Sequence, residues 1–383
     1  MSTQSQTSPK LRVLIVGGGV AALECALALH ELAPELTATS ILAGSSEFVY
    51  RPLTVREPFA LPQATRYPLA PIAADAGAEL IADELARVEP DRNVVHTTGG
   101  LEIEYDALVL ALGARITPRY EHAITIDDHG LDEALHGLIQ DIEGSYVGSV
   151  AFLAPGRMAW PLPLYELALM TAARAYDMNV ELATTIITPE DSPLGIFGAA
   201  ASERVAELLL KTGIETINSA YAEVPRSGEI VVNPGDRHLK VDRIVALPEL
   251  YGPSVRGVEL SEHGFLRVDS SLRMPGHERI FAAGDATEFA VKQGGIASQQ
   301  SDSIARSIAV MAGADVKPES FKPVLRGMLL TGEKPLYMCA RITGGQGFSS
   351  EVGEEPMWSP PSKIAARYLA PYLDARDQAS SAA

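Results

Sequence analysis

The sequence LRVLIVGGGVAA, residues 11–22, decides the fold. Its first six residues form a short apolar run rich in branched side chains, which is typical of a buried parallel strand. Gly17, Gly19 and Ala22 then fit the pattern G-x-G-x-x-A, in which the glycines permit a tight turn and a close approach to a pyrophosphate. The free N–H groups at the start of the following helix favour an anion. The stretch therefore predicts a dinucleotide site, with a purely structural glycine turn as the alternative.

The residues after this turn extend it into a β-α-β unit. Residues 21–33 have helical spacing, Pro34 closes the helix, and residues 37–42 read as a second strand. A block of the same shape lies between residues 149 and 190, where SVAFLAPGRMAW, PLPLYELALMTAARAYD and NVELATTIITPE read as strand and turn, helix, and strand. The sequence therefore predicts an α/β fold with two Rossmann-like dinucleotide-binding domains.

Composition excludes several other classes of protein. The chain has 383 residues, of which 46% are hydrophobic and 21% charged, so most of it has enough apolar material for a packed core. Its net charge of −18 argues against binding to nucleic acid or to anionic membrane surfaces. Cys25 and Cys339 cannot form a disulfide framework or a cysteine-rich metal site, so we expect no metal and a reducing compartment, the cytoplasm. No stretch reads as a transmembrane segment.

Two later motifs each end a predicted strand with a glycine: YDALVLALGA at residues 105–114 and RIFAAGDA at residues 279–286. Together with the first turn, and in this order, they resemble the two-dinucleotide-domain flavoproteins of the pyridine nucleotide-disulfide oxidoreductase superfamily. The resemblance covers about residues 11–370. It implies a glutathione-reductase-like fold that binds FAD, with a C-terminal capping region.

The resemblance also implies how the chain is divided. We expect a discontinuous FAD-binding domain of residues 10–123 plus 257–325 and a second, degenerate NAD-type Rossmann-like domain of residues 124–256. A C-terminal capping or interface region would cover residues 326–375. Residues 1–9 and 376–383 would be disordered tails.

In this superfamily the Gly-Asp pair lies beside FAD and the aspartate hydrogen-bonds the ribitol, a role that the resemblance gives to Asp285. The helix from about Gly294 would point its positive end at the flavin pyrimidine and stabilise a reduced, anionic flavin. Lys292 is a candidate catalytic residue that would add to this effect, and a solvated surface lysine is the alternative. The expected cofactor-binding residues are Gly17, Gly19, Ala22, Arg51, Pro52, Ala111, Gly113, Gly284, Asp285, Gly294 and Gly295.

Other segments narrow the resemblance. FVYRPL at residues 48–53 is similar to sulfide:quinone reductases, flavocytochrome c sulfide dehydrogenases and type II NADH dehydrogenases. PLYE at 163–166, TPE at 188–190 and PSK at 361–363 are most similar to the sulfide-oxidising branch. That branch lacks a working second glycine pattern, and so does the second turn here, APGRMAW at 154–160. We therefore expect no tight binding of NAD(P)H.

The chain departs from these families at the adenosine ribose and at the redox cysteines. Ala43 stands where an Asp or Glu should hold the ribose, and Glu47 is a candidate substitute. Trp160 stands at a cysteine position of the sulfide-oxidising branch, which leaves Cys339 as the one candidate thiol near the site, while Cys25 is expected to pack against the sheet. One thiol cannot form the usual persulfide bridge, so sulfide oxidation by that mechanism is not expected.

Trp160 and Cys339 remain candidate catalytic residues. Trp160 would cover the flavin face or carry an electron, and the alternative is that it fills the space between the two domains. The alternative for Cys339 is a small buried hydrophobe. Residues 360–369 could form one short helix, buried in the domain or against a dimer partner, so a homodimer stays open.

The leading hypothesis is an FAD-dependent oxidoreductase. It would pass electrons through a non-covalently bound flavin from an unknown donor to a quinone or other small acceptor, without a redox-active disulfide. One alternative is a non-catalytic or weakly FAD-binding relative that serves as a binding or assembly module. Another is an NAD(P)H-dependent flavin reductase.

Overall fold

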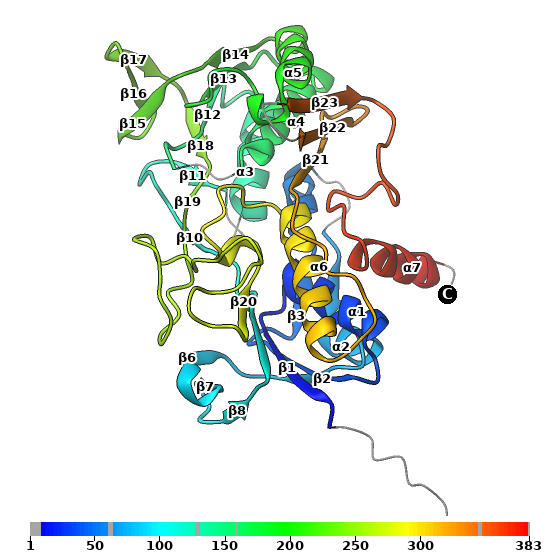
Figure 1. Cartoon of the computed structure of the whole chain (residues 1–383). Coiled ribbons are helices and arrows are strands. Elements are labelled where there is room, and N and C mark those ends of the chain that lie inside the picture. Colours follow the sequence, from blue (N-terminus) through cyan, green and yellow to red (C-terminus); the bar gives the residue numbers. More distant parts are fainter. Residues whose placement is uncertain (1–8, 60–63, 127–130, 158–159, 344–346, 382–383) are drawn as a thin grey trace, which may run out of the picture.

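The structure is a computed structural model that describes residues 9–59, 64–126, 131–157, 160–343 and 347–381. Two parallel sheets lie toward opposite ends of the molecule, and the C-terminal strands and helix lie along one side (Figure 1). None of the helices in these ranges combines the length and the apolar content that a membrane span requires. The expectation for residues 1–9 mostly concerns residues 1–8, which lie outside the described ranges.

The first sheet has five parallel strands in the order β20-β9-β1-β2-β5. The strands β1 and β2 begin and end as predicted. The first lies between Pro9 and Gly17, and the second lies between Pro34 and Gly44. The edge strand β20 joins this sheet from a part of the chain that lies far beyond β9 in the sequence. The strands are β1 Leu11–Val16, β2 Thr37–Leu42, β5 Glu79–Ile81, β9 Ala107–Leu110 and β20 Ile280–Ala282, and helix α1, Val20–Leu32, links β1 to β2.

The second sheet is also parallel and has the order β11-β18-β12-β13-β14. Helices on this sheet enclose a second hydrophobic core. Its elements are β11 Ile124–Thr125, α3 Leu131–Glu143, β12 Ser149–Leu153, α4 Leu162–Asp177, β13 Ala183–Ile187, α5 Ala199–Lys211, β14 Ile214–Ile217 and β18 Arg243–Ala246. The predicted class, an α/β fold with two Rossmann-like units, is confirmed.

Smaller elements complete the molecule. Helix α6, Gly294–Met311, follows β20, and an antiparallel C-terminal sheet of three strands follows α6: β21 Val324–Leu329, β22 Leu336–Thr343 and β23 Gly347–Gly353. The others are β3 Glu47–Val49, η1 Arg51–Phe59, β4 Arg66–Pro68, α2 Leu69–Asp75, β6 Leu85–Glu89, η2 Pro90–Arg92, β7 Val94–Thr97, β8 Glu102–Glu104, β10 Arg115–Thr117, η3 Gly195–Phe197, β15 Tyr221–Arg226, β16 Glu229–Asn233, β17 Arg237–Lys240, β19 Glu249–Tyr251, η4 Gly284–Ala286 and α7 Leu369–Ser381.

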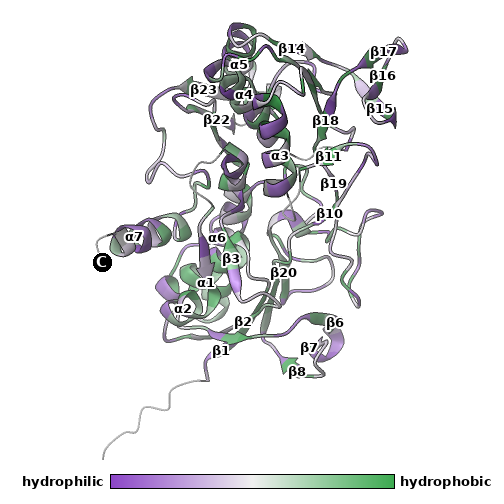
Figure 2. Cartoon of the chain, turned by 180° about the vertical axis from the view of Figure 1, so that it is seen from behind, coloured by the Kyte–Doolittle hydropathy of each residue, from purple (hydrophilic) through white to green (hydrophobic). Residues whose placement is uncertain are grey.

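Helices α1 and α6 pack closely on the first sheet. Small residues allow this approach, since a Cβ atom on Gly284 would lie 3.3 Å from the Cβ atoms of both Ala21 on α1 and Ala297 on α6. Most of α1 is buried, and hydrophobic colouring dominates α1 and α2 in Figure 2. This packing places the amino ends of α1 and α6 near the same edge of the sheet, the edge where the parallel strands end.

The C-terminal segment differs from the expectation. Residues 360–368 are not helical, and α7 begins at Leu369 and continues to Ser381, through most of the tail that was expected to be disordered. The start of α7 is set by Glu24, whose carboxylate accepts the backbone N–H groups of Arg367, Tyr368 and Leu369 at 2.6–3.1 Å. Further contacts hold the helix against α2 and β4; the bonded pairs are Tyr372 with Asp75, Arg376 with Asp75, and Tyr67 with Asp377.

Candidate functional site

The predicted glycine turn joins β1 to α1 with an open face. Gly17 has φ +131°, and a Cβ atom there would lie 2.2 Å from the carbonyl oxygen of Ala111, so the turn packs against the end of β9. A Cβ atom on Gly19 would meet no atom within 4 Å. Since α1 has no capping side chain and no acidic residue in its first turn, its first N–H groups remain available to an anion. Ala22 is fully buried against the sheet.

The end of β9 lies beside this turn. Ala111 donates its N–H to the carbonyl oxygen of Val16 at 2.8 Å. Gly113 follows with φ +72°, a conformation that favours glycine, and a Cβ atom there would meet open space. Gly19 after β1 and Gly113 after β9 therefore both face space that a ligand could fill.

The Gly-Asp pair follows β20 and brings three predicted site residues together. The carboxyl of Asp285 makes no hydrogen bond within the described residues. Burial raises the pKa of Asp285, and the positive charges of Lys292 and Arg51 oppose that rise. Pro52 follows Arg51 directly in η1. The carboxyl of Asp285 therefore lies within the electrostatic influence of two basic side chains, next to the end of β20.

Lys292 is buried, which contradicts the alternative of a solvated surface lysine. Its ammonium donates a hydrogen bond to the carbonyl oxygen of Thr287 and lies 4.0 Å from the centre of the Phe265 ring. Burial lowers the pKa of Lys292 to about 8, against the opposing charge of Asp285. The side chain is therefore poised to gain or lose a proton near neutral pH.

The amino end of α6 carries polar atoms without partners. The helix starts at Gly294 and Gly295 with no capping side chain, and a Cβ atom on Gly294 would lie 3.0 Å from the side chain of Ile364. Among the residues that the structure describes, the buried amide oxygen of Gln293 and the buried amide nitrogen of Gln300 find no hydrogen-bond partner. The other amide atom of Gln300 accepts the N–H of Gly284 at 2.7 Å. Buried, unpaired polar atoms at this position are suited to a polar ligand.

Ala43 provides no carboxylate at the end of β2. It is buried, and its Cβ atom would lie 3.4 Å from a Cβ atom on Gly18. Glu47, the candidate substitute, begins β3 with an exposed side chain. The ribose position next to the glycine turn therefore has no acidic residue from β2 itself.

Side chains of this chain occupy the second turn. A Cβ atom on Gly156 would lie 3.1 Å from the ring of Tyr221, and Arg157 stacks 4.7 Å from the centre of the Tyr251 ring. Met158 and Ala159 lie outside the described residues. The space that a second pyrophosphate would enter is therefore partly filled by aromatic side chains.

Glu190, the acidic residue that follows β13, is hydrogen-bonded to neighbouring side chains of the protein. Glu190 accepts a hydrogen bond from the hydroxyl of Tyr165 at 2.7 Å and one from Thr188 at 3.2 Å. Burial raises the pKa of Glu190. In a functional NAD site an acid at this strand end binds the ribose, whereas here it is committed to the protein.

Trp160 lies just before the start of α4, and Cys339 stands on β22 opposite Arg326. The carbonyl oxygen of Arg326 accepts a hydrogen bond from the amide of Gln293 at the start of α6. The Trp160 ring packs edge-on against Phe197 at 5.6 Å, and Phe197 in turn covers Gly327 on β21, where a Cβ atom would lie 2.5 Å from its ring. Trp160 thus packs against the second core. Cys339 is buried on β22. No described hydrogen bond, ion pair or ring contact joins either residue to Lys292.

A buried ion pair joins α4 to the segment that precedes α7. The ammonium of Lys363 lies 2.5 and 2.6 Å from the two carboxylate oxygens of Glu166 on α4, and one of these oxygens also accepts the N–H of Leu330. Burial raises the pKa of Glu166 and lowers that of Lys363, while each charge favours the ionised form of the other. Both residues stand in motifs that the sequence singles out, but their pairing across 197 positions has no local signal.

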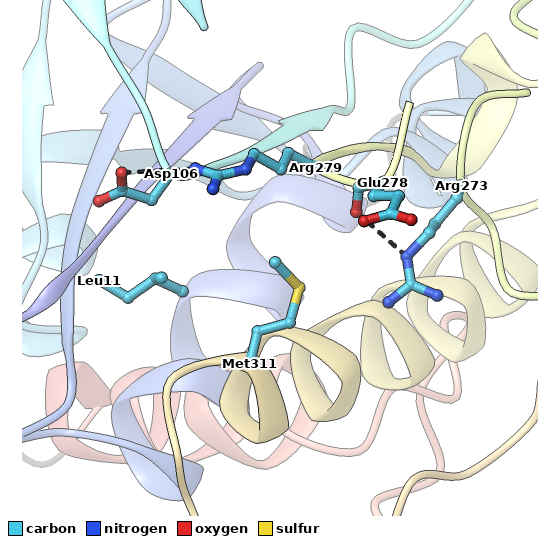
Figure 3. A pocket seen from close by; sticks show the side chains of 6 residues that line it. All are labelled: Leu11, Asp106, Arg273, Glu278, Arg279 and Met311. Carbon is cyan, nitrogen blue, oxygen red and sulfur yellow. Dashed lines mark hydrogen bonds and ion pairs between the residues drawn. The ribbon is translucent and has the colours of Figure 1, made fainter. Parts of the chain in front are cut away.

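A separate pocket of about 600 Å³ lies at the opposite edge of the first sheet (Figure 3). Asp106 and Arg279 immediately precede β9 and β20, and their charged groups lie 3.8 Å apart. The pocket therefore opens at the amino ends of the strands, away from the glycine turn. Its lining residues are Leu11, Asp106, Arg273, Glu278, Arg279 and Met311.

Two parallel sheets, a glycine turn at the carboxyl edge of the first and a Gly-Asp pair beside it define an oxidoreductase of the two-Rossmann-domain class. The chain belongs to the pyridine nucleotide-disulphide oxidoreductase family, whose model matches residues 2–130 and 166–303. It is accordingly an oxidoreductase, and it lies on the branch that resembles sulfide-quinone reductases.

Individual relatives agree with this assignment. The chain is 25% identical over 301 residues to a sulfide-quinone reductase of Aquifex aeolicus, covering 72% of this chain and 68% of that one. It is 24% identical to an NADH dehydrogenase-like protein of Mycobacterium tuberculosis, covering 72% of each. The fold is similar to the solved sulfide:quinone oxidoreductase of Aquifex aeolicus, with a TM-score of 0.81, 21% identity and coverage of 90% and 87%. A ferredoxin reductase from Rhodopseudomonas palustris follows with a TM-score of 0.68, 18% identity and coverage of 89% and 88%.

Proposed function

We propose that the chain is an FAD-dependent oxidoreductase that passes electrons from a donor other than NAD(P)H to a quinone or other small acceptor, without a redox-active disulfide. The observation that carries this proposal is the arrangement at one sheet edge. There the open glycine turn of α1 lies next to the Gly-Asp pair, since a Cβ atom on Gly284 would lie 3.3 Å from that of Ala21, and the charges of Arg51 and Lys292 act on Asp285.

The residues present fit FAD. The N–H groups above Gly19 would hold the pyrophosphate, and the unbonded carboxylate of Asp285 would accept a ribitol hydroxyl. The start of α6 at Gly294 and Gly295 would face the flavin pyrimidine. When bound, FAD supplies the electron-accepting and electron-donating chemistry, and the protein supplies binding, orientation and charge.

The protein's own groups would tune that chemistry. The positive end of α6 and the ammonium of Lys292 favour negative charge in their vicinity. Because the pKa of Lys292 is about 8, this ammonium is charged at neutral pH and can also release a proton locally. The positive charges of Lys292 and Arg51 favour the ionised carboxylate of Asp285, against the burial that raises its pKa.

Three observations support the proposed donor and acceptor: the occupied second glycine turn, the cysteine content and the similarity to a quinone-reducing relative. Tyr221 over Gly156 and the engaged Glu190 oppose NAD(P)H as a donor. Cys25 and Cys339 are the two cysteines of the chain, and they are buried on separate elements, so a dithiol relay has no residues to use. A quinone acceptor is favoured because a curated relative is named a sulfide-quinone reductase.

The visible spectrum of the purified protein, recorded before and after addition of FAD and gel filtration, tests the proposal. We expect flavin bands that co-elute with the protein. Anaerobic photoreduction followed by mixing with a short-chain quinone should restore the oxidised spectrum, whereas NADH should not bleach it. A protein that stays colourless with FAD would overturn the proposal in favour of the non-catalytic relative, and rapid bleaching by NADH would favour the flavin reductase.

A further inference from the structure

The first sheet has a gap where an acidic side chain would hold a ribose. In Rossmann folds this acid stands at the end of the second strand, beside the glycine turn. Here β2 ends at Leu42, and Ala43 and Gly44 follow it. Ala43 lies against Gly18 of the turn, so the position is correctly placed although neither residue carries a carboxylate.

The side chain of Glu84 occupies the space above Gly44. A Cβ atom on Gly44 would lie 2.5 Å from Cγ and 2.8 Å from Oε1 of Glu84, so the glutamate carboxylate stands where a side chain of residue 44 would stand. Glu84 comes from the link between β5 and β6. Hydrogen bonds hold this link in place, since Ala43 donates its N–H to Ile81 at 3.1 Å and Thr98 donates its N–H to the carbonyl oxygen of Glu84 at 2.8 Å.

The two neighbouring acids of this link are used differently. The carboxylate of Asp83 accepts hydrogen bonds from the hydroxyl of Thr98 and the N–H of Gly99, and hydrogen bonds, led by that from Thr97, lower its pKa to about 2. The carboxylate of Asp83 therefore stabilises the turn at Thr98 and Gly99. The carboxylate of Glu84 is exposed and accepts no hydrogen bond from any described residue, so it is available to a ligand.

We propose that Glu84 accepts the hydroxyl groups of the adenosine ribose of FAD and so replaces the acid that β2 lacks. This inference rests on the proposed function, because it requires that FAD binds. Glu47 is the weaker candidate, since β3 pairs with β4 and no described contact brings its carboxylate to Gly18, Ala43 or Gly44.

Titration of the flavin-free full-length protein with two flavins tests the proposal. The flavins are FAD and the analogue that lacks the 2′-hydroxyl of the adenosine ribose. We expect the wild type to bind FAD more tightly than the analogue. Glu84→Gln should weaken FAD binding about 10- to 100-fold, as expected for loss of charge-assisted hydrogen bonds, and should bind both flavins with similar affinity. The difference between the two flavins isolates this contact.

Matched variants separate the contact from other effects. Glu79→Gln removes an exposed carboxylate at the amino end of β5, the far edge of the same sheet, and should leave both affinities unchanged. Gly44→Ala adds a methyl group that meets the Glu84 side chain and should weaken FAD binding without removing any charge. Ala43→Asp in the Glu84→Gln background should recover part of the lost affinity.

The outcomes are distinguishable. A wild type that binds no FAD contradicts the proposed function itself. If the wild type binds FAD and Glu84→Gln still discriminates between the two flavins as the wild type does, the role of Glu84 is overturned. Equal affinity of the wild type for FAD and for the analogue also overturns it.

Discussion

Gly17 and Gly19 stand two positions apart, but a side chain would meet different surroundings at each. We predict that Gly17→Ala destabilises the fold by about 3 kcal/mol or more, because φ is +131° and the methyl would collide with the Ala111 carbonyl. Gly19→Ala should cost about 1 kcal/mol as a poorer helix cap, since φ is −93° and the space is open. It should nevertheless weaken FAD binding at least about tenfold by blocking the pyrophosphate.

Chemical denaturation and flavin titration of these two variants separate the two effects. The expected pattern is a stability defect for Gly17→Ala and a binding defect for Gly19→Ala. Normal flavin affinity of a folded Gly19→Ala protein would show that no pyrophosphate lies above this turn.

Asp302 on α6 makes stability depend on pH. One of its carboxylate oxygens is buried and accepts no hydrogen bond from any residue in the described part of the chain. Burial and the nearby Glu24 raise the pKa of Asp302 to about 8, against the charges of Arg367 and Arg306. Between about pH 4 and pH 8 the folded state therefore holds a proton that the unfolded state has lost. We predict that the free energy of unfolding falls by about 1–2 kcal/mol from pH 5 to pH 8.

The matched variant is Asp302→Asn, which keeps the shape and cannot ionise. Thermal or urea unfolding at several pH values below 8 should show a flatter dependence for the variant than for the wild type. The measurements stop at pH 8 because the lowered pKa of Lys292 makes the free energy of unfolding rise with pH above that value, which would oppose the effect of Asp302. Equal slopes for both proteins would contradict the assignment.

At the scale of elements, the start of α7 depends on one carboxylate of α1. Glu24 is fully buried and accepts three backbone N–H groups as well as the hydroxyl of Ser298. We predict that Glu24→Gln costs about 2–4 kcal/mol, because an amide group replaces a charged acceptor at a helix amino end. Hydrogen exchange should then rise across residues 367–381, whereas Glu31→Gln, at an exposed position of the same helix, should leave it unchanged. Unchanged protection in Glu24→Gln would refute the capping role.

Elements set by local sequence were predictable. The first strand, the second strand and α6 follow from apolar runs, glycine turns and helical spacing. The start of α7 was not predictable, because Glu24 lies more than 340 positions earlier in the chain. The site shows the same division: Asp285 follows from its Gly-Asp motif, whereas the burial of Lys292 depends on Phe265 and the position of Glu84 on Gly44, contacts that no local pattern indicates.

For the whole molecule, the buried pair of Glu166 and Lys363 ties α4 of the second sheet to the segment before α7. We predict that Lys363→Met destabilises the protein by about 3–5 kcal/mol, because it leaves a buried carboxylate unpaired. The double variant Glu166→Leu, Lys363→Met should recover part of this loss, although the N–H of Leu330 then lacks its acceptor. A double-mutant cycle from denaturant unfolding measures the coupling, and additive effects would show that the pair contributes nothing as a pair.

β20 enters the first sheet beside β9 only after the chain has passed through the whole second sheet. A ribosome makes the chain from the amino end, so β12, β13, β14 and β18 emerge complete while β9 still has an open edge and α1 still lacks α6. During that interval the apolar face of α1 is exposed, and the Gly-Asp pair does not yet exist. The site proposed for the flavin is therefore complete only late in synthesis, and a chain released before residue 280 would present an unpaired strand and a bare helix to aggregation or to chaperones.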